Sequence, residues 1–331
     1  MKCGYALVVL LAICVVGWLS GTALAVSVPY LAALVFLGGL CYRVARWAIP
    51  PVPFRIPTTC GQQRSLSWIQ HSRLGNPATG WWAAGRMVCE ILFFRSLFRN
   101  TRAELNENKF VFGESKWLWL AALAFHWSLL IILLRHLRLF LLPVPGWVLS
   151  LQQVDGFFQI GVPELYLSDV IVTVALAYLL ARRLRNPQVR FMSLFSDYFA
   201  LLLLLAIAVT GVCMRYFYKV DTATVKQFAL GLVTFSPSIP RQIGSLFYVH
   251  LALVSALAVY FPFSKLAHMG GVFLSPTRNL ANNSRAKRHV NPWNYPVHTH
   301  TYAEWEEEFR DKLVAANLPI EAEHVATVST D

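Results

Sequence analysis

Residues 116–142, KWLWLAALAFHWSLLIILLRHLRLFLL, form an apolar stretch, and residues 243–268, IGSLFYVHLALVSALAVYFPFSKLAH, form a second one. Each stretch carries a pair of histidines, His126 and His136 in the first, and His250 and His268 in the second. About 20 helical residues cross the ~30 Å hydrocarbon core of a bilayer. A histidine inside lipid is costly unless it has a task, and neutral imidazole is a good ligand for iron. The pattern therefore predicts two bis-histidine haem b sites stacked across a membrane.

The composition places the chain among integral membrane proteins. Of its 331 residues, 56% are hydrophobic and only 14% are charged, and the mean hydropathy is +0.50. A soluble domain carries about a quarter charged residues. The net charge of +12 comes from basic residues between the apolar segments, so membrane topology explains it better than nucleic-acid binding. The six cysteines form no CxxC pair, so no local motif indicates an iron–sulfur cluster, a zinc site or covalent haem.

The apolar segments predict an all-α membrane protein with six transmembrane helices. The predicted spans are residues 4–24, 28–49, 117–142, 165–184, 196–217 and 243–268. The first ends in an A-x-A-like pattern typical of a cleaved signal peptide. We expect an uncleaved helix instead, because only Lys2 precedes it as a positive charge and a second apolar segment follows at once.

The chain divides into four predicted parts. Residues 1–49 form a transmembrane hairpin, and residues 50–116 form a cytoplasmic loop with an amphipathic helix on the membrane surface or under a partner. Residues 117–269 form a four-helix dihaem cytochrome b core. Residues 270–331 form a cytoplasmic tail.

The distribution of lysine and arginine predicts the orientation of the chain. With both termini in the cytoplasm, 23 of the 29 basic residues lie inside, and six lie outside or near the outer face. This asymmetry agrees with the positive-inside rule and predicts a multi-pass protein of the cytoplasmic (inner) membrane.

The orientation gives each histidine a depth. Because the third and sixth spans run antiparallel, His136 and His250 should meet near the outer face, and His126 and His268 near the inner face. Ten residues of helix rise about 15 Å and eighteen about 27 Å, so the two helices must tilt or bend to match. A kink at Pro262 can supply that bend.

The four histidines also fit roles that need no haem. They can be ordinary helix histidines bonded to the backbone, or they can form a proton relay. A relay favours neighbouring acids, and the third and sixth spans contain none. The chain can also be a membrane anchor without a redox centre, or a transporter, although fixed ligand pairs suit iron better than alternating access.

Four residues near the predicted outer face are candidates for a quinol site. Arg135 and Arg138 can hold haem propionates or orient a quinone head group, or they can be arginines that reach from a helix end to the interface. Tyr166 and Asp169 open the fourth span. Asp169 can accept a quinol proton, or it can be an ordinary acid in the first turn of a helix.

Two features are expected on the inner side. Lys265 can neutralise the propionates of the inner haem or mark the cytoplasmic end of its span. The loop FRIPTTCGQQR, residues 54–64, is a predicted docking surface for a partner, and a lone Cys60 within it is weak evidence for a redox role.

Histidine pairs spaced by ten and eighteen residues on antiparallel spans resemble the gamma subunit of respiratory nitrate reductase, over the last four spans. Longer stretches resemble the DsrM family, the cytochrome b subunits of the DsrMKJOP complex of dissimilatory sulfur metabolism, over nearly the whole chain. These stretches are PFRIPTTCGQQRSL, LFRNTRAEL, KWLWLAALAFHWS, NPQVR, YFPFSKLAHMGGVFLSPTRNLANNSR and RHVNPWNYPV.

The resemblance implies an electron-transfer subunit of an oxidoreductase complex. Menaquinol would be oxidised near the outer haem, and electrons would pass through the inner haem to a cytoplasmic iron–sulfur subunit like DsrK, which resembles heterodisulfide reductase. Other DsrMKJOP subunits would be further partners. The resemblance leaves open whether electrons flow as in sulfate reducers or as in sulfur oxidisers.

Overall fold

The computed structural model describes residues 2–19, 23–49, 55–56, 61–106, 109–156, 164–239, 243–283, 296 and 298–321. The chain divides into two compact units. The first comprises Met1–Pro50 with Phe54–Arg288, and the second comprises Pro51–Pro53 with His289–Asp331. In the second unit, Thr301 caps the N-terminus of helix α13 (Tyr302–Ala315) and forms a capping box with Glu304.

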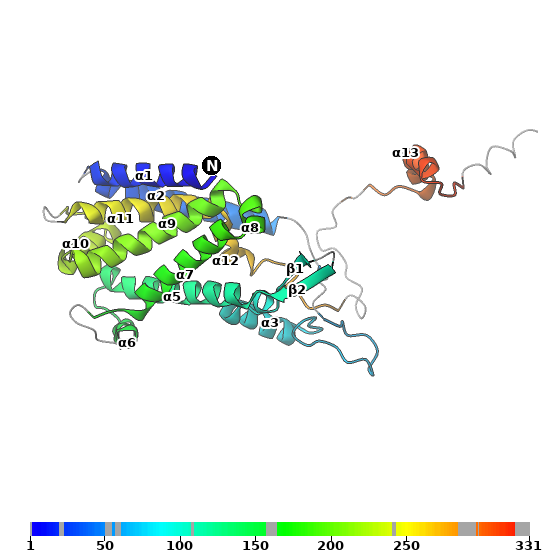
Figure 1. The fold of residues 1–331 in the computed structure, drawn as a ribbon, viewed down its shortest axis with the longest axis horizontal. Coiled ribbons are helices and arrows are strands. Elements are labelled where there is room, and N and C mark those ends of the chain that lie inside the picture. The colour runs from blue at the N-terminus through cyan, green and yellow to red at the C-terminus, as the bar shows by residue number, and fades with distance from the viewer. Residues whose placement is uncertain are drawn as a thin grey trace, which may run out of the picture. The chain divides into compact units, whose positions relative to one another are not determined.

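The first unit is a helical bundle with one β-hairpin (Figure 1). Its helices are α1 (Lys2–Leu19), α2 (Ala23–Ala48), α3 (Gly80–Phe93), α4 (Arg95–Phe98), α5 (Lys116–Phe140), α6 (Gly146–Asp155), α7 (Leu167–Arg185), α8 (Pro187–Met192), α9 (Phe195–Val212), α10 (Thr222–Val233), α11 (Ser245–Tyr260) and α12 (His268–Gly271). A π-helical turn, Cys213–Phe217, extends α9. The antiparallel strands are β1 (Thr101–Asn106) and β2 (Lys109–Glu114).

Among the residues that the structure describes, five helices are long and apolar enough to cross a membrane. They are Lys2–Leu19, Leu24–Ala48, Lys116–Phe140, Phe195–Phe217 and Ser245–Phe263. These helices identify a multi-pass membrane protein. The predicted fourth span corresponds to α7, whose 19 residues include an aspartate and three arginines, so it falls short of that composition. The span at residues 165–184, and with it the total of six spans, therefore stays a prediction.

The long helices pack in two groups that share α9 (Figure 1). In the first group, Ala6 and Leu10 of α1 pack with Leu203 of α9 and Leu253 of α11 in one buried cluster. Gly17 lets α1 approach α11 closely, because a Cβ there would lie 2.9 Å from the side chain of Ala252. The second group holds α5, α7 and α9 together.

The second group has its own buried cluster. Phe125 of α5, Val172 and Leu176 of α7, and Leu204 of α9 form this cluster. Thus α7 lies between α5 and α9, and its buried face is apolar although its ends are charged. Helices α6 and α10 lie at one end of the bundle, and α3 with the β-hairpin lies at the other (Figure 1). We call these the outer end and the inner end.

The sequence predicts one helix that continues to His268, but α11 ends at Tyr260. Two short 3-10 turns follow, Phe261–Phe263 and Lys265–Ala267, and extended backbone at Ser264 separates them. The structure thus has a full break near Pro262, where the sequence predicts only a bend. Tertiary contacts hold the break, since Arg43 of α2 donates a hydrogen bond to the Pro262 carbonyl at 2.6 Å.

The amphipathic helix expected in residues 50–116 corresponds to α3. Its polar side chains Arg86 and Glu90 are buried, whereas Trp81 and Phe93 are exposed. Arg86 donates to the carbonyl of Gly75 at 2.9 Å. The helix therefore binds the bundle through its polar face and presents apolar side chains outward, as a helix in a lipid interface does.

Candidate functional site

At the inner end, the imidazoles of His126 and His268 face each other. Their ring centres lie 5.9 Å apart, and their planes are nearly perpendicular, at 81°. Phe94 and Phe125 pack edge-on against the His126 ring, with centres 4.9 and 4.8 Å away. Residues far apart in the sequence thus bring two imidazoles together in an aromatic surrounding.

At the outer end, His136 lies on α5 and His250 on α11. Gly211 of α9 packs beside His250, since a Cβ at that glycine would lie 3.6 Å from the ring carbon Cε1. The structure therefore brings His126 and His268 together, and the pairing of His136 with His250 stays a prediction.

Hydrogen bonds decide which ring nitrogen of three histidines carries the proton. The Nδ1 atoms of His126 and His136 each lie 2.7 Å from the carbonyl oxygen one turn earlier on α5, and Nδ1 of His268 lies 2.8 Å from the Lys265 carbonyl. A carbonyl only accepts hydrogen bonds, so Nδ1 must be the donor in each pair. The lone pair of each neutral ring is then on Nε2, the nitrogen that faces away from the residue's own backbone.

His250 reaches the same state through a side chain of another helix. Its Nδ1 lies 2.8 Å from the hydroxyl of Thr210 on α9. That hydroxyl donates its own proton to the Ala206 carbonyl at 2.8 Å, so it accepts from His250. Histidines that bind metals usually donate the second ring N–H to such an acceptor, which fixes the ring and raises its basicity.

The inner pair fits an iron between the two rings. An iron held by two imidazole nitrogens at about 2 Å each sets the ring centres about 6 Å apart, once the size of the rings is counted. The measured separation of 5.9 Å agrees with this spacing. No group of three or more His, Cys, Asp or Glu side chains that could hold a metal ion occurs among the residues that the structure describes. Two neutral imidazoles, each with its lone pair on Nε2, fit the iron of a haem, which His126 and His268 would hold.

A buried polar network lies beside the outer histidines. Arg135 contacts two carboxylates, Asp155 of α6 at 3.0 Å and Asp169 of α7 at 2.6 Å. Ser168 donates through its backbone N–H and its hydroxyl to Asp155, at 2.8 and 2.7 Å. Arg135 directly precedes His136 on α5. One arginine thus holds two acids from separate elements next to a predicted iron ligand.

Tyr166 lies between two guanidinium groups at the edge of this network. The central carbon of Arg135 is 3.7 Å from its ring centre, and that of Arg215 is 3.8 Å away. Tyr216 connects the two sides, because its hydroxyl accepts from the Tyr166 N–H at 2.9 Å and donates to Asp169 at 3.0 Å. The second oxygen of Asp169 is therefore held by a phenol, while the first is held by Arg135.

Three of the four predicted quinol-site residues, Arg135, Tyr166 and Asp169, lie in this network. Arg138 does not, because its guanidinium donates to the Gln152 side chain of α6 at 2.7 Å. On the inner side, Lys265 forms an ion pair with Asp197 at 2.9 Å.

Sequence reasoning missed Asp155, Ser168, Arg215 and Tyr216. Asp155 ends α6, a short helix that the hydropathy pattern does not predict, and Arg215 and Tyr216 lie on the π-helical turn after α9. The available signal was charge, since Asp155 and Arg215 are ionisable residues beside predicted spans near the outer face. The 54–64 loop lies partly outside the described residues, as does Cys60.

Comparisons with known proteins agree with this arrangement. A model of the nitrate reductase gamma subunit family matches residues 90–286, which include all four histidines. The "Hdr-like menaquinol oxidoreductase cytochrome b-like subunit" of Archaeoglobus fulgidus is 47% identical over 280 residues, 82% of this chain and 84% of that relative. The protein of the same name from Archaeoglobus profundus is 42% identical over 275 residues, 81% of each chain. The family match covers more than half of the sequence and the relatives most of it, so this chain belongs to the nitrate reductase gamma subunit family.

Proposed function

We propose that this chain is a dihaem cytochrome b of the cytoplasmic membrane that oxidises menaquinol and transfers the electrons to a cytoplasmic partner. His126 and His268 would hold the inner haem b, and His136 and His250 the outer one. The observation that carries the proposal is the inner pair, whose ring centres lie 5.9 Å apart. Six spans, α7 included, with both termini in the cytoplasm, complete the proposed topology.

The protein's own contribution at each haem is a fixed ligand geometry. Each Nδ1–H is held by a carbonyl or a hydroxyl, so each Nε2 is already oriented before a haem binds. When bound, the haems supply the redox chemistry, which moves one electron at a time across the bilayer. The aromatic rings of Phe94 and Phe125 cover two sides of the His126 ring.

The outer network suits a reaction that releases protons. Oxidation of a quinol to a quinone releases two protons together with two electrons. Asp169 is the proposed proton acceptor, because its carboxylate is only 13% exposed and lies 2.6 Å from Arg135, the residue before His136. Tyr216 would position the second carboxylate oxygen. The quinol is proposed from the printed names of the relatives.

The inner end is the proposed exit for electrons. The relatives are named Hdr-like oxidoreductases, and the chain resembles the DsrM family, so the proposed partner is a heterodisulfide-reductase-like iron–sulfur subunit such as DsrK, within a DsrMKJOP-type complex of dissimilatory sulfur metabolism. Residues 54–64 and the tail after residue 270 are the proposed docking surfaces. The alternative function is that of a membrane anchor that holds such partners and has no redox centre.

Optical spectroscopy of the purified protein separates these functions. The dihaem cytochrome predicts two haems b per chain by pyridine haemochrome assay, both reduced by a soluble menaquinol analogue. A protein that folds in detergent but shows no reducible b-type spectrum would be an anchor. A single haem per chain would contradict the assignment of one of the two pairs.

A further inference from the structure

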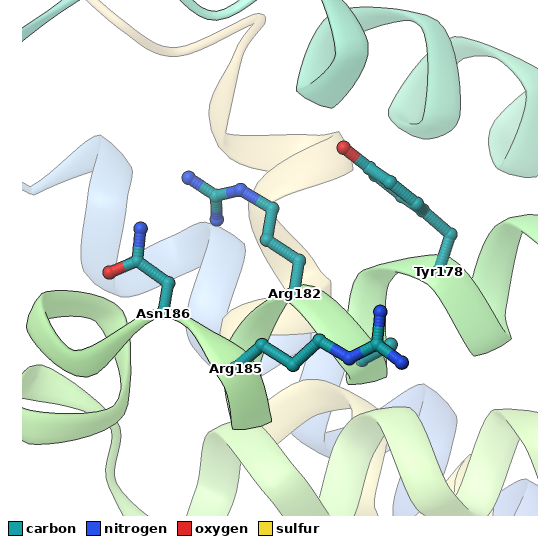
Figure 2. A pocket seen from close by; sticks show the side chains of 5 residues that line it. Tyr178, Arg182, Arg185 and Asn186 are labelled. Atoms are coloured by element: carbon teal, nitrogen blue, oxygen red, sulfur yellow. The ribbon is translucent and has the colours of Figure 1, made fainter.

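A cavity of about 330 Å³ opens at the inner end of α7. It is lined by Tyr178, Ala181, Arg182, Arg185 and Asn186. Figure 2 shows Tyr178, Arg182 and Arg185 extending from successive turns of α7, with Asn186 where the helix ends. The lining thus presents two guanidinium groups, a phenol and an amide, all of which can donate hydrogen bonds.

The two arginines of the cavity have no acid beside them. Neither Arg182 nor Arg185 forms an ion pair or a side-chain hydrogen bond with any residue in the described part of the chain. Their neighbours behave differently, because Arg183 and Lys265 both contact Asp197, at 3.6 and 2.9 Å. Half-buried Arg182 and exposed Arg185 thus leave two guanidinium groups at one cavity that can bind an anion.

The cavity begins where the elements of the inner histidine pair meet. Ala175 and Leu179 of α7 pack in the cluster that contains Phe125, the residue before His126, and Leu266, two residues before His268. Arg182 lies seven residues after Ala175, which is two turns or about 10 Å along the same helix face. The α7 face that packs on Phe125 and Leu266 therefore continues towards the cationic cavity.

Resting on the proposed function, we propose that Arg182 and Arg185, with Tyr178 and Asn186, bind the propionate carboxylates of the inner haem. A haem b carries two carboxylates on one edge, which need cationic partners at the membrane boundary. Planar guanidinium groups match carboxylates in two-point contacts, and lysine does so less well. Lys265, the residue that the sequence favours for this role, is already paired with Asp197.

The same cations could instead hold the phosphate of an anionic lipid, since basic pockets at cytoplasmic helix ends bind such head groups. Position favours the propionates. Half-buried Arg182 lies on the α7 face that begins beside Phe125 and Leu266, rather than on a face of its own. A lipid would not need that register with the inner histidine pair.

A redox titration of the full-length protein tests the proposal, with the two haems followed by optical absorbance. The wild-type protein must first show two titrating haems, so a failure of the proposed function is seen before any variant is compared. Arg182→Gln should lower the midpoint potential of the inner haem alone, because loss of a nearby positive charge disfavours the reduced form. Arg182→Lys should restore most of the shift. Arg190→Gln, which removes a cation of α8 outside the cavity, should leave both potentials unchanged.

The double variant Arg182→Gln/Arg185→Gln should lose part of its inner haem during purification and keep its outer haem. If the potential of the inner haem is unchanged in both the single and the double variant, the propionate site is wrong. Unchanged potentials with less phospholipid phosphorus in the purified protein would assign the cavity to a lipid head group and overturn the proposal.

Discussion

The two ends of the bundle hold similar histidine pairs in opposite surroundings. At the outer end, two buried acids and two arginines lie beside His136 and His250. At the inner end, the rings of Phe94 and Phe125 pack on His126, and the nearby Asp197 is already paired with cations. Under the proposed function, the outer end would exchange protons as well as electrons, and the inner end would pass on electrons.

The largest effect should come from removing one histidine from each end in turn. His268→Ala should abolish the inner haem, halve the haem content per chain, and stop electrons from reaching the cytoplasmic partner while quinol still reduces the remaining haem. His136→Ala should remove only the outer haem. Haem content and quinol-driven reduction measure both effects. Loss of both haems from either variant would show that the two ends are not independent.

Replacement of Arg135 should lower the free energy of unfolding much more than replacement of Arg138. Arg135→Met leaves Asp155 and Asp169 buried without their shared cation, which should cost about 3–5 kcal/mol. Arg138→Met removes only a hydrogen bond to Gln152 and should cost about 1 kcal/mol. Thermal unfolding in detergent, followed by circular dichroism, compares the two variants. Equal costs would mean that the network does not stabilise the outer end.

Asp169 in the first turn of α7 and Asp197 in the first turn of α9 allow a direct comparison of the two ends. Asp169→Asn at the outer end should slow quinol oxidation by about 10²-fold, because an amide cannot accept the proton. Asp197→Asn at the inner end should leave the rate of quinol oxidation unchanged. Both proteins should retain two haems, and stopped-flow reduction by a quinol analogue measures the rates. Similar rates in the two variants would remove the functional distinction between the ends.

The smallest effect should come from Thr210, a residue of α9 whose hydroxyl bonds to the His250 ring on α11. Thr210→Val removes the acceptor of the His250 N–H, which lowers the basicity of the ligand. The midpoint potential of the outer haem should rise slightly, and the inner haem should not respond. Thr173→Val is the control, because its hydroxyl bonds only to the Asp169 carbonyl one turn earlier on α7. A shift of equal size in both variants would argue against a role for Thr210.

The proximity of His126 and His268 could be predicted from the sequence, because span orientation and helical rise follow from local composition. The end of α11 could not be placed in the same way. Pro262 indicates a weak point, but the position of the break depends on α2, where Arg43 binds the Pro262 carbonyl. A Cβ at Gly39 would lie only 2.9 Å from the Pro262 side chain. Such contacts join residues more than 200 positions apart, and no local pattern contains them.

Only part of the outer network could be predicted, for a related reason. Arg135, Tyr166 and Asp169 lie at the ends of predicted spans, where a charge in an apolar segment stands out. Asp155 ends a short helix that hydropathy does not detect, and Tyr216 lies at the end of a predicted span; only the fold brings them to Arg135 and Asp169. The buried face of α3 could not be predicted either, because the burial of Glu90 depends on its ion pair with Arg278, far along the chain.

The junction of α3 and α5 has a consequence for how the protein is made. The last carbonyls of α3, at Leu92 and Phe93, accept hydrogen bonds from the indoles of Trp127 and Trp119 of α5, at 3.1 and 2.7 Å. A ribosome completes α3 before either tryptophan exists. Carbonyls without donors are costly in hydrocarbon, so the end of α3 should stay in water or at the lipid head groups until α5 has been made. The contact between α3 and α5 can therefore form only after the later helix exists.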